Sequence, residues 1–564
     1  MTESAAIRAS TTAGSGPIGS DRVVSAAAIL YDSRGFDAGR ERLTGLAVAS
    51  AGFLAAHVEH AAPGPLWLHP TDEGTDAAAF RGRFPTDRPV EVIHRLDTRR
   101  LAEPGALFVP GPVLAPFAWR RRVIGDAAFS LTGITHTMST GRALDAVRDL
   151  LVAPTQSWDA LICTSRAVRD LVGGVLERHA SHLAERNGGA IVPAPVQLPV
   201  IPLGIDAPVI ADGERARFRA DHGVPDDAVA VLYLGRLSAH AKAHPLPMFR
   251  ALGRAAERTS RPIVAVLAGW YHDAETRLAF EATAAALAPT VRVVMVDARP
   301  PDSKRSALAG SDLFLSLADN LQESFGLTPL EAMAAGLPCV VTDWDGYRDT
   351  VLDGETGFRV PAALPPAGLG ADLAWRRLLG VDDDSVLHAL TCEVVAIDTE
   401  AAAEAIARLA DDPALRQRLG RAGERRARSF AWPRVIAAYE ELWAELAERR
   451  VAAGLIPGRE PSTAVDPFAA FAGYATPGSA VALRIETVAG LDPITELTRI
   501  AALPKAAIDP RLPVDAVGLL ELLDRHGALT VPLDQSADRL RAQRAGLRAA
   551  FWLAHAGIVR ITPV

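Results

Sequence analysis

The sequence predicts an α/β protein with two Rossmann-like domains, each a parallel sheet flanked by helices, and a mainly helical C-terminal extension. From Arg22 onward, apolar runs of strand length alternate with amphipathic stretches, which is typical of a parallel sheet with helices on its faces. The proline-containing segment LPVIPLGIDAP, Leu198 to Pro208, interrupts this alternation and indicates a domain boundary. Beyond Gly458 the alternation ends, and prolines and small residues follow.

Length and composition indicate a globular protein. The 564 residues are 49% hydrophobic and 22% charged, which suits roughly two or three domains. A net charge of −8 argues against a protein that coats nucleic acid. The cysteines lie in apolar sequence without the spacing of a metal site or a disulfide framework, so we expect them in the core of a cytosolic protein. They are Cys163, Cys339 and Cys392.

The first twenty residues lack the apolar centre of a signal peptide. No apolar run approaches the ~20 residues that are needed to span a bilayer. We therefore expect residues 1–20 to be a disordered leader, and the protein to be cytoplasmic, with peripheral contact to the inner face of the membrane left open.

Residues 21–205 make the first predicted domain. Its strands are predicted at Val23 to Leu30, Leu66 to His69, Val90 to His94, Phe129 to Thr135 and Asp159 to Thr164. No Gly-x-Gly-x-x-Gly follows the first strand, which argues against a dinucleotide cofactor. The loop after it carries Gly35, Gly39 and Gly45 ahead of a helix. Helix capping and turn chemistry would explain these glycines as readily as a binding role.

His136 lies just past the carboxyl end of a predicted strand, in SLTGITHTMST, which is where α/β sheets bind their ligands. A lone histidine is more often a packed or surface residue, so the strand-end position is the reason to consider it for a site. The nearby basic run Arg120 to Arg122 could attract an anionic acceptor or a lipid surface, although a solvated basic face explains it more simply.

Residues 206–428 make the second predicted domain. Its strands are predicted at Val229 to Leu234, Ile263 to Ala268, Val291 to Val296, Asp312 to Leu317 and Cys339 to Thr342. After the fourth, Thr328-Pro329-Leu330-Glu331 has the pattern of a helix start, with an N-cap residue, proline at the first position and glutamate at the third. Phosphate can bind such a helix N-terminus. Thr328 and Glu331 also fit a capping box, which would make this glutamate structural.

Glu323 precedes Glu331 by eight positions, and EAMAAGLPCVVTD and DGETGF follow. This stretch closely resembles the donor-binding segment of the retaining glycosyltransferases of the GT-B fold, family 4. The resemblance implies that Glu323 contacts the donor sugar and that Glu331 holds the ribose hydroxyls. It also implies that backbone amides in between hold the diphosphate, namely those of Ser324, Phe325, Gly326 and Leu327.

The same resemblance implies two Rossmann-like domains that face a cleft, bordered by the loop that contains Gly45. Related enzymes present a histidine to the donor sugar at the position of His136. They have a glycine–arginine pair and then a lysine in the stretch that reads GRLSAHAKAHP here, and both cations meet the donor diphosphate. These positions are Arg236 and Lys242, which lie one residue further apart than usual. Fixed cations can stabilise a leaving nucleoside diphosphate without a metal.

Two acidic patterns are interpreted as structural. Asp343-Trp344-Asp345 has the Asp-x-Asp form that another glycosyltransferase fold uses to hold a divalent metal. A three-residue pattern is weakly specific, and this one follows a strand of a different architecture, so a loop near the donor is the preferred interpretation. The run Asp382 to Asp384 is interpreted as a solvated, turn-rich excursion.

Residues 429–457 resemble the family's closing segment, in which a helix of the second domain crosses back to the first. Trp432, Tyr439 and Trp443 fit one apolar face of that helix, so we expect them to pack. In residues 458–564 we predict helices at Val514 to Arg525 and Ala537 to His555, and a final strand in IVRIT. This extension resembles a winged-helix module only distantly and lacks a concentrated basic helix, so an interaction or stabilising role is preferred over nucleic-acid binding.

The expected function is transfer of a sugar from a nucleotide-diphosphate-sugar donor to a hydroxyl acceptor, with retention at the anomeric carbon and without a metal or other cofactor. The acceptor would be a carbohydrate, a lipid-linked group or a small molecule. Two alternatives remain open, a nucleotide-sugar epimerase of the same fold and a non-catalytic GT-B scaffold. The charged residues Glu323, Arg236 and Glu331 argue against the scaffold, because nothing obliges a scaffold to keep charges in a cleft.

Overall fold

The structure is a computed structural model, and it describes residues 26–33, 45–239, 242, 244–271, 273–460, 465–474, 482–503, 516–533 and 537–564. The chain divides into two compact units, Met1–Pro461 and Ser462–Val564. The predicted leader, the start of the first predicted strand, Gly35 and Gly39 lie outside the described residues.

The first sheet of the larger unit has six parallel strands in the order β3-β2-β1-β4-β5-β6. The strands are β1 (Ala26–Tyr31), β2 (Leu66–Pro70), β3 (Val90–Val92), β4 (Gly105–Val109), β5 (Ser130–Ile134) and β6 (Ala160–Ile162). The helices around it are α1 (Gly45–His60), α2 (Ala77–Arg83), α3 (Ala115–Arg122), α4 (Gly141–Asp149) and α5 (Arg166–Asn187). Alternate residues of β1 enter two cores, because successive strand side chains point to opposite faces: Ile29 joins the core of α1, and Ala28 joins that of α3 to α5.

The second sheet also has six parallel strands, in the order β12-β11-β10-β7-β8-β9. They are β7 (Val229–Leu234), β8 (Ile263–Ala268), β9 (Arg292–Val296), β10 (Leu313–Ser316), β11 (Cys339–Thr342) and β12 (Gly357–Val360). The helices are α6 (Glu214–Asp221), α7 (Pro245–Ala256), α8 (Ala274–Leu287), α9 (Pro301–Gly310), α10 (Leu327–Ala334), α11 (Tyr347–Thr350), α12 (Ala371–Leu378), α13 (Asp384–Cys392), α14 (Thr399–Asp411) and α15 (Pro413–Ala427). A short antiparallel pair, β13 (Ala362–Ala363) and β14 (Ala396–Ile397), flanks α12 and α13 in sequence.

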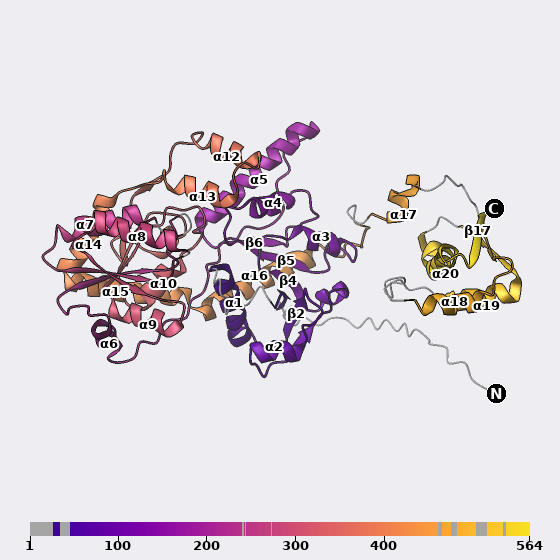
Figure 1. Cartoon of the computed structure of the whole chain (residues 1–564), viewed down its shortest axis with the longest axis horizontal. Helices are drawn as coiled ribbons and strands as arrows, with labels where there is room; N and C mark the ends of the chain where they lie inside the picture. Colours follow the sequence, from indigo (N-terminus) through magenta and orange to yellow (C-terminus); the bar gives the residue numbers. More distant parts are fainter. Residues whose placement is uncertain are drawn as a thin grey trace. The chain divides into compact units, whose positions relative to one another are not determined.

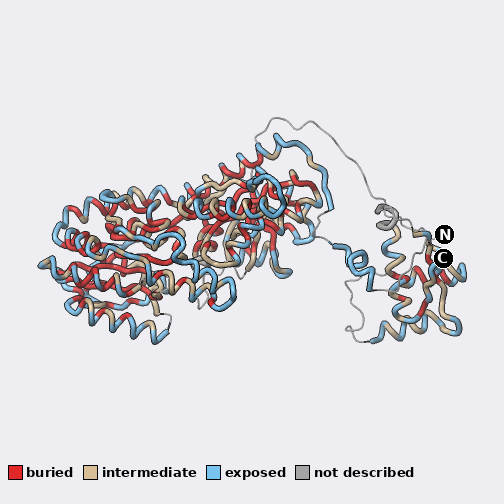
Figure 2. The backbone as a smooth tube through the Cα atoms, turned by 90° about the horizontal axis from the view of Figure 1, so that it is seen from above, coloured by how far each residue is buried: buried red, intermediate tan, exposed pale blue. Residues whose placement is uncertain are grey.

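The two sheets share one topology. Numbered within each domain, both have the strand order 3-2-1-4-5-6 of the Rossmann fold. The central strands are buried on both faces, which is why their sequences are continuous apolar runs such as VAVLYL in β7. In Figure 2 the buried segments, in red, run through the interior of the larger unit, and the exposed segments lie mainly at its outside. The predicted pair of Rossmann-like domains is confirmed.

Helix α16 (Trp432–Ala452) leaves the second domain and packs against α1 and the strands of the first. In Figure 1 this orange helix runs among the indigo and purple elements of the first domain. Trp432, Tyr439 and Trp443 are buried, and the Trp443 indole donates to the Thr132 hydroxyl at 3.1 Å. These three aromatic residues therefore pack, as predicted.

The smaller unit holds a three-stranded antiparallel sheet in the order β16-β15-β17, with helices that pack against it. Its elements are α17 (Pro467–Ala470), β15 (Ala482–Thr487), α18 (Pro493–Ala501), α19 (Ala516–His526), β16 (Ala528–Pro532), α20 (Ala537–His555) and β17 (Val559–Pro563). Its core includes Ile485, Leu523 and Leu553. The two predicted helices and the final strand are present, whereas β15, β16 and α18 were not predicted.

Candidate active site

The strand order of the second sheet reverses between β7 and β10, which lie side by side in parallel. In open α/β sheets, ligands bind outside the carboxyl ends of the strands at such a switch point. Arg236 follows β7, and the segment from Asp319 to Glu323 follows β10. The topology therefore brings Arg236 and Glu323, which are 87 positions apart in the sequence, to one edge of the sheet.

Arg236 is a half-buried cation at this edge. Its backbone carbonyl accepts a hydrogen bond from the Tyr233 hydroxyl at 3.0 Å. Burial lowers the pKa of Arg236. Within the part of the chain that the structure describes, its guanidinium forms no ion pair with a carboxylate. A partly desolvated cation without an anionic partner is a suitable site for an anion.

Glu323 is 8% exposed and pairs with Lys242, whose Nζ lies 3.1 Å from Glu323 Oε2. Burial and the nearby Glu323 carboxylate raise the pKa values of Tyr233 and Tyr347, so both phenols stay neutral beside it. The predicted lysine and glutamate are thus in direct contact.

Helix α10 begins at Leu327, with Gly326 as its N-cap residue. The predicted capping box of Thr328 and Glu331 is therefore wrong, because both residues already lie inside the helix. Gly326 has φ of 91°, and a Cβ there would lie 2.4 Å from the Tyr347 ring, so the backbone turns where only glycine fits. The amides of Gly326, Leu327 and Thr328 are in no hydrogen bond among the described residues.

After Glu323, the loop before α10 turns the Phe325 ring away from the sheet edge and into the core. The Phe325 ring is 2% exposed and packs near Phe430, at 6.1 Å between ring centroids. The Ser324 carbonyl accepts a hydrogen bond from the Thr164 hydroxyl at 3.4 Å. Because Thr164 follows β6, the loop contacts the first domain at the carboxyl edge of its sheet.

Glu331 lies one turn into α10, half-buried, and its Oε1 accepts a hydrogen bond from Lys304 Nζ of α9 at 2.8 Å. Lys304 and Glu331 belong to different helices, so no sequence pattern predicts that they pair. The pair leaves the second carboxylate oxygen of Glu331 available to a neutral hydroxyl group.

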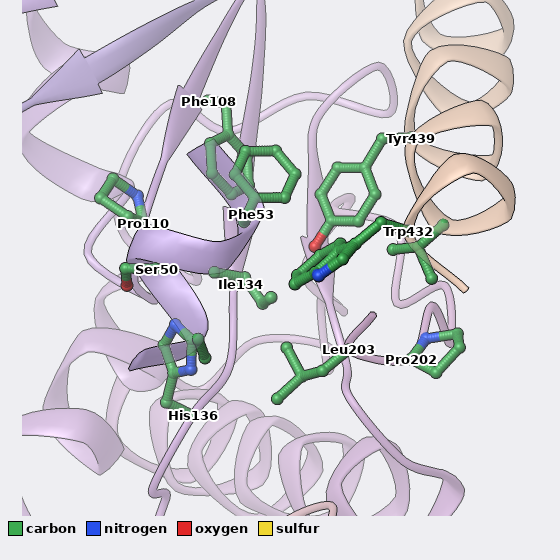
Figure 3. A pocket seen from close by; sticks show the side chains of 12 residues that line it. Ser50, Phe53, Phe108, Pro110, Ile134, His136, Pro202, Leu203, Trp432 and Tyr439 are labelled. Carbon is green, nitrogen blue, oxygen red and sulfur yellow. The ribbon is translucent and has the colours of Figure 1, made fainter. Parts of the chain in front are cut away.

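His136 lies in the first domain, after β5, where it lines a pocket that is otherwise mainly apolar. Figure 3 shows His136 and Ser50 on one side of this pocket, and Trp432 and Tyr439 of α16 on the other. Burial lowers the pKa of His136 to about 4, and its Nε2 has no hydrogen-bond partner among the described residues. The imidazole is therefore neutral at pH 7 and has a ring nitrogen free for a ligand.

Thr135, the residue before His136, is connected to the loop before α10 by a short series of hydrogen bonds. The Thr135 hydroxyl accepts from the Thr164 amide at 3.2 Å, and the Thr164 hydroxyl in turn reaches Ser324. Gly45 is the first residue of α1, the helix that supplies Ser50 to the pocket of His136. Gly45 itself is not among the residues that line this pocket.

The two carboxylates of Asp343-Trp344-Asp345 point to different partners. Asp343 pairs with Arg359 at 3.3 Å, whereas Asp345 accepts a hydrogen bond from the Ser165 hydroxyl of the first domain at 3.2 Å. Asp345 has φ of 38°, and burial and Glu323 raise its pKa to about 7. Across the described ranges, no group of three or more acidic, histidine or cysteine side chains is arranged to hold a metal ion.

The run Asp382 to Asp384 is not a solvated excursion, because each carboxylate has a structural partner. Asp382 forms a double hydrogen bond with Arg376 at 2.6 and 2.8 Å, and Asp383 caps α13. Asp384 accepts from the Gly141 amide of the first domain at 3.2 Å. On the same helix, His388 Nδ1 accepts from Gln322 Nε2 at 2.7 Å. Helix α13 therefore contacts both the first domain and the loop of Glu323.

Two Rossmann-like domains, joined by a helix that returns to the first, form the GT-B architecture. Residues 214–368, which contain β7 to β12 and the helix N-terminus described above, match the family model Glycosyl transferases group 1. Among the described residues, no helix combines the length and apolar character that crossing a membrane would need.

The D-inositol 3-phosphate glycosyltransferase of Kribbella flavida is 30% identical over 244 residues, which cover 42% of this chain and 48% of that protein. The phosphatidyl-myo-inositol mannosyltransferase of Mycobacterium tuberculosis is 31% identical over 189 residues, which cover 33% of this chain and 46% of that protein. The chain spans about half the length of the curated relatives it matches. The solved sucrose-phosphate synthase from Thermosynechococcus elongatus superposes with a TM-score of 0.45 at 18% identity, covering 75% of this chain and 100% of that one.

Proposed function

We propose that this protein transfers a sugar from a nucleotide-diphosphate-sugar donor to a hydroxyl acceptor, with retention at the anomeric carbon and without a metal. One observation carries the proposal. At the β7/β10 switch point, the cations Arg236 and Lys242 and the buried carboxylate Glu323 share one edge of the sheet with the amides of a helix N-terminus, which have no partner in the described part of the chain.

The donor diphosphate is proposed to bind the amides of Gly326 and Leu327, where the helix dipole favours negative charge. Arg236 and Lys242 then stabilise the charge that develops on the leaving nucleoside diphosphate when the glycosidic bond breaks. Glu331 accepts hydrogen bonds from the ribose hydroxyls with the oxygen that Lys304 leaves available.

The sugar is proposed to lie between Glu323 of the second domain and His136 of the first. The hydrogen bond from Thr164 to Ser324 supports this placement, since it brings the two strand edges together. A neutral imidazole can hydrogen-bond a sugar hydroxyl without the desolvation cost of a buried charge. In this proposal, the Glu323 carboxylate stabilises the positive charge that develops on the sugar ring in the transition state.

The donor proposal is tested by thermal shift with UDP, GDP and ADP and with their sugar conjugates. A ligand that binds only the folded state must raise its melting temperature. Reactions with the stabilising donor are then run with D-inositol 3-phosphate, an acceptor suggested by the relatives' names, and with simple glycosides. Release of free nucleoside diphosphate together with a glycosylated product of unchanged anomeric configuration, seen by proton NMR, is expected. An epimerised sugar nucleotide without transfer would favour the epimerase alternative.

Transfer is expected to continue in the presence of EDTA, because Arg236, Lys242 and the α10 N-terminus supply the positive field that a divalent metal would otherwise supply. Initial rates are measured with EDTA, with EDTA plus excess Mg²⁺, and with EDTA plus excess Mn²⁺. A complete loss of turnover that either metal restores would contradict the metal-free mechanism.

A further inference from the structure

Asn320 joins the two segments that carry Lys242 and Glu323. Its side chain is fully buried, and its Nδ2 donates to the Lys242 carbonyl at 3.1 Å. Its Oδ1 accepts from two amides of its own loop, Gln322 N at 3.0 Å and Glu323 N at 3.1 Å. One amide side chain is therefore hydrogen-bonded to the backbone of the cation on one side and to the backbone of the carboxylate on the other.

Only an amide side chain of this length satisfies both partners. The Lys242 carbonyl needs a donor, and the two backbone amides need an acceptor. An aspartate would present an acceptor to the Lys242 carbonyl, and a serine would keep the local turn but lack the reach across to Lys242. Asn320 is itself fixed, because its carbonyl accepts from the Trp344 indole at 3.0 Å.

We propose that Asn320 is a positioning residue of the donor site, which sets the placement of Lys242 relative to Glu323 and so keeps the cation ready for the diphosphate. The inference rests on the proposed function for its link to the donor. Its geometric part, the connection between two loops across the sheet edge, does not depend on the donor.

The test compares Asn320→Ser with wild type and with Thr342→Val. Thr342 is a matched control, because it is fully buried on the adjacent strand β11 and its hydroxyl donates to the Ala318 carbonyl at 2.7 Å, near the same loop. Both variants lose one buried hydrogen bond from a side chain to a backbone carbonyl, but only Asn320→Ser loses the bond to Lys242. Asn320→Asp is the second variant, with the acceptor kept and the donor lost, in case the serine variant fails to fold.

Hydrogen exchange in the free protein is the first readout. In Asn320→Ser we expect exchange in the peptide that contains Lys242 and His244 to rise by roughly tenfold, with little change in the peptide that contains Gln322 and Glu323. Thr342→Val should leave the Lys242 peptide as in wild type. Unchanged exchange in that peptide in both Asn320 variants would overturn the inference.

Calorimetric titration with UDP, GDP and ADP is the second readout. Asn320→Ser is expected to lower the affinity for the nucleotide that wild type binds by roughly tenfold. The double variant Asn320→Ser, Lys242→Met should bind this nucleotide no more weakly than Lys242→Met alone. Wild-type affinity in Asn320→Ser, or fully additive losses in the double variant, would overturn the inference. If wild type binds none of the three nucleotides, the proposed function fails, while the exchange readout still decides whether Asn320 holds the two loops together.

Discussion

Glu323 and Glu331 have different surroundings, and this difference predicts different effects of substitution. Glu331→Gln should mainly weaken nucleotide binding, by roughly tenfold, because the proposed hydrogen bonds from the ribose hydroxyls to Glu331 would be made in ground and transition states alike. Glu323→Gln should lower kcat by roughly a hundredfold or more with a much smaller effect on nucleotide affinity, because in the proposed function the carboxylate faces a sugar ring that becomes cationic only in the transition state. Both variants are compared by calorimetry with nucleoside diphosphate and by steady-state kinetics.

The Lys304–Glu331 pair complicates the first of these variants. Lys304→Met serves as its control, because it removes the partner of Glu331 while the carboxylate remains. A Glu331→Gln effect that Lys304→Met reproduces in full would assign the loss to the ion pair and not to ribose recognition. Equal losses of nucleotide affinity in both glutamate variants, with unchanged turnover at saturation, would contradict the proposed division of roles.

Asp319 should make stability depend on pH near neutrality. Burial raises its pKa from 3.8 to about 7, and its Oδ1 has no hydrogen-bond partner among the described residues. As pH falls from 8 to 5, the folded protein takes up this proton while the unfolded chain does not, so the free energy of unfolding rises. Asp319→Asn should therefore stabilise the protein at pH 8, by on the order of 3 kcal/mol, and progressively less toward pH 5. Urea unfolding at both pH values measures the difference.

Asp382 gives a control of opposite sign. A side-chain hydrogen bond from Arg376 lowers its pKa, so the ionised form stabilises the folded state above the usual aspartate range and this contribution is lost as pH falls. Asp382→Asn should consequently destabilise the protein at pH 8 and have less effect at low pH. A stabilising effect of Asp319→Asn that does not change between pH 5 and 8 would contradict the assignment of the titration to Asp319.

The residues that sequence reasoning missed at the site are those whose partners come from distant parts of the chain. Asn320 and Lys304 follow no recognisable motif, and their importance lies in hydrogen bonds to Lys242 and Glu331. The capping box failed for another reason: the positive φ of Gly326 starts α10 earlier than the Thr-Pro pattern indicates. Gly326 ends the loop and caps α10 because of its left-handed backbone conformation, and the spacing of residues in the sequence does not reveal this conformation.

Among the elements, α16 depends on close approach to the segment that connects the two domains. Gly204 lies against Trp432, the first residue of α16, and a Cβ at Gly204 would lie 2.2 Å from the indole ring. Gly204→Ala should therefore destabilise the larger unit by roughly 2 kcal/mol or more, since an overpacked site forces the ring or the backbone to move. Thermal unfolding of the variant measures the effect.

The matched control is Gly173→Ala in α5, where an added Cβ would meet nothing within 4 Å. Alanine is the better helix former there, so this variant should be neutral or more stable by a few tenths to about 1 kcal/mol. If Gly204→Ala were as stable as Gly173→Ala, the Trp432 contact would not hold α16 in place.

The strands were predictable where burial is continuous and the run is apolar throughout. The bounds of β7, β8 and β11 agree with the prediction. Strand β2 is one residue longer than predicted, β1 ends one residue later, and β3, β5, β6, β9 and β10 are shorter by one or more residues. Strands β4 and β12 were not predicted, because each is a short run that begins with glycine, which otherwise indicates a turn. Only the pairing of β4 with β1 and β5 shows that GALFV is a central strand.

At the scale of the whole molecule, the larger unit should fold without the smaller one. A chain that ends after Glu460 retains the hydrogen bond from Arg459 N to Arg122 O at 2.8 Å and leaves out the separate core of the smaller unit. We expect this shortened protein to be monodisperse, to melt as the larger unit does in the full chain, and to bind the same nucleotide. Size-exclusion chromatography, calorimetric scanning and nucleotide titration check these points. Recovery only as aggregate would show that the C-terminal unit completes the core.

The sequence by itself determined the two Rossmann-like domains and the candidate donor segment, because both depend on local patterns: apolar runs of strand length, and a motif contained in one strand–loop–helix stretch. The tertiary structure alone decided which residues meet at the site. The strand order places β7 beside β10 and so brings Arg236 to the edge that carries Glu323, and helix packing puts Lys304 against Glu331. These contacts join residues far apart in the chain, and their energies depend on burial and distance, which sequence spacing does not contain.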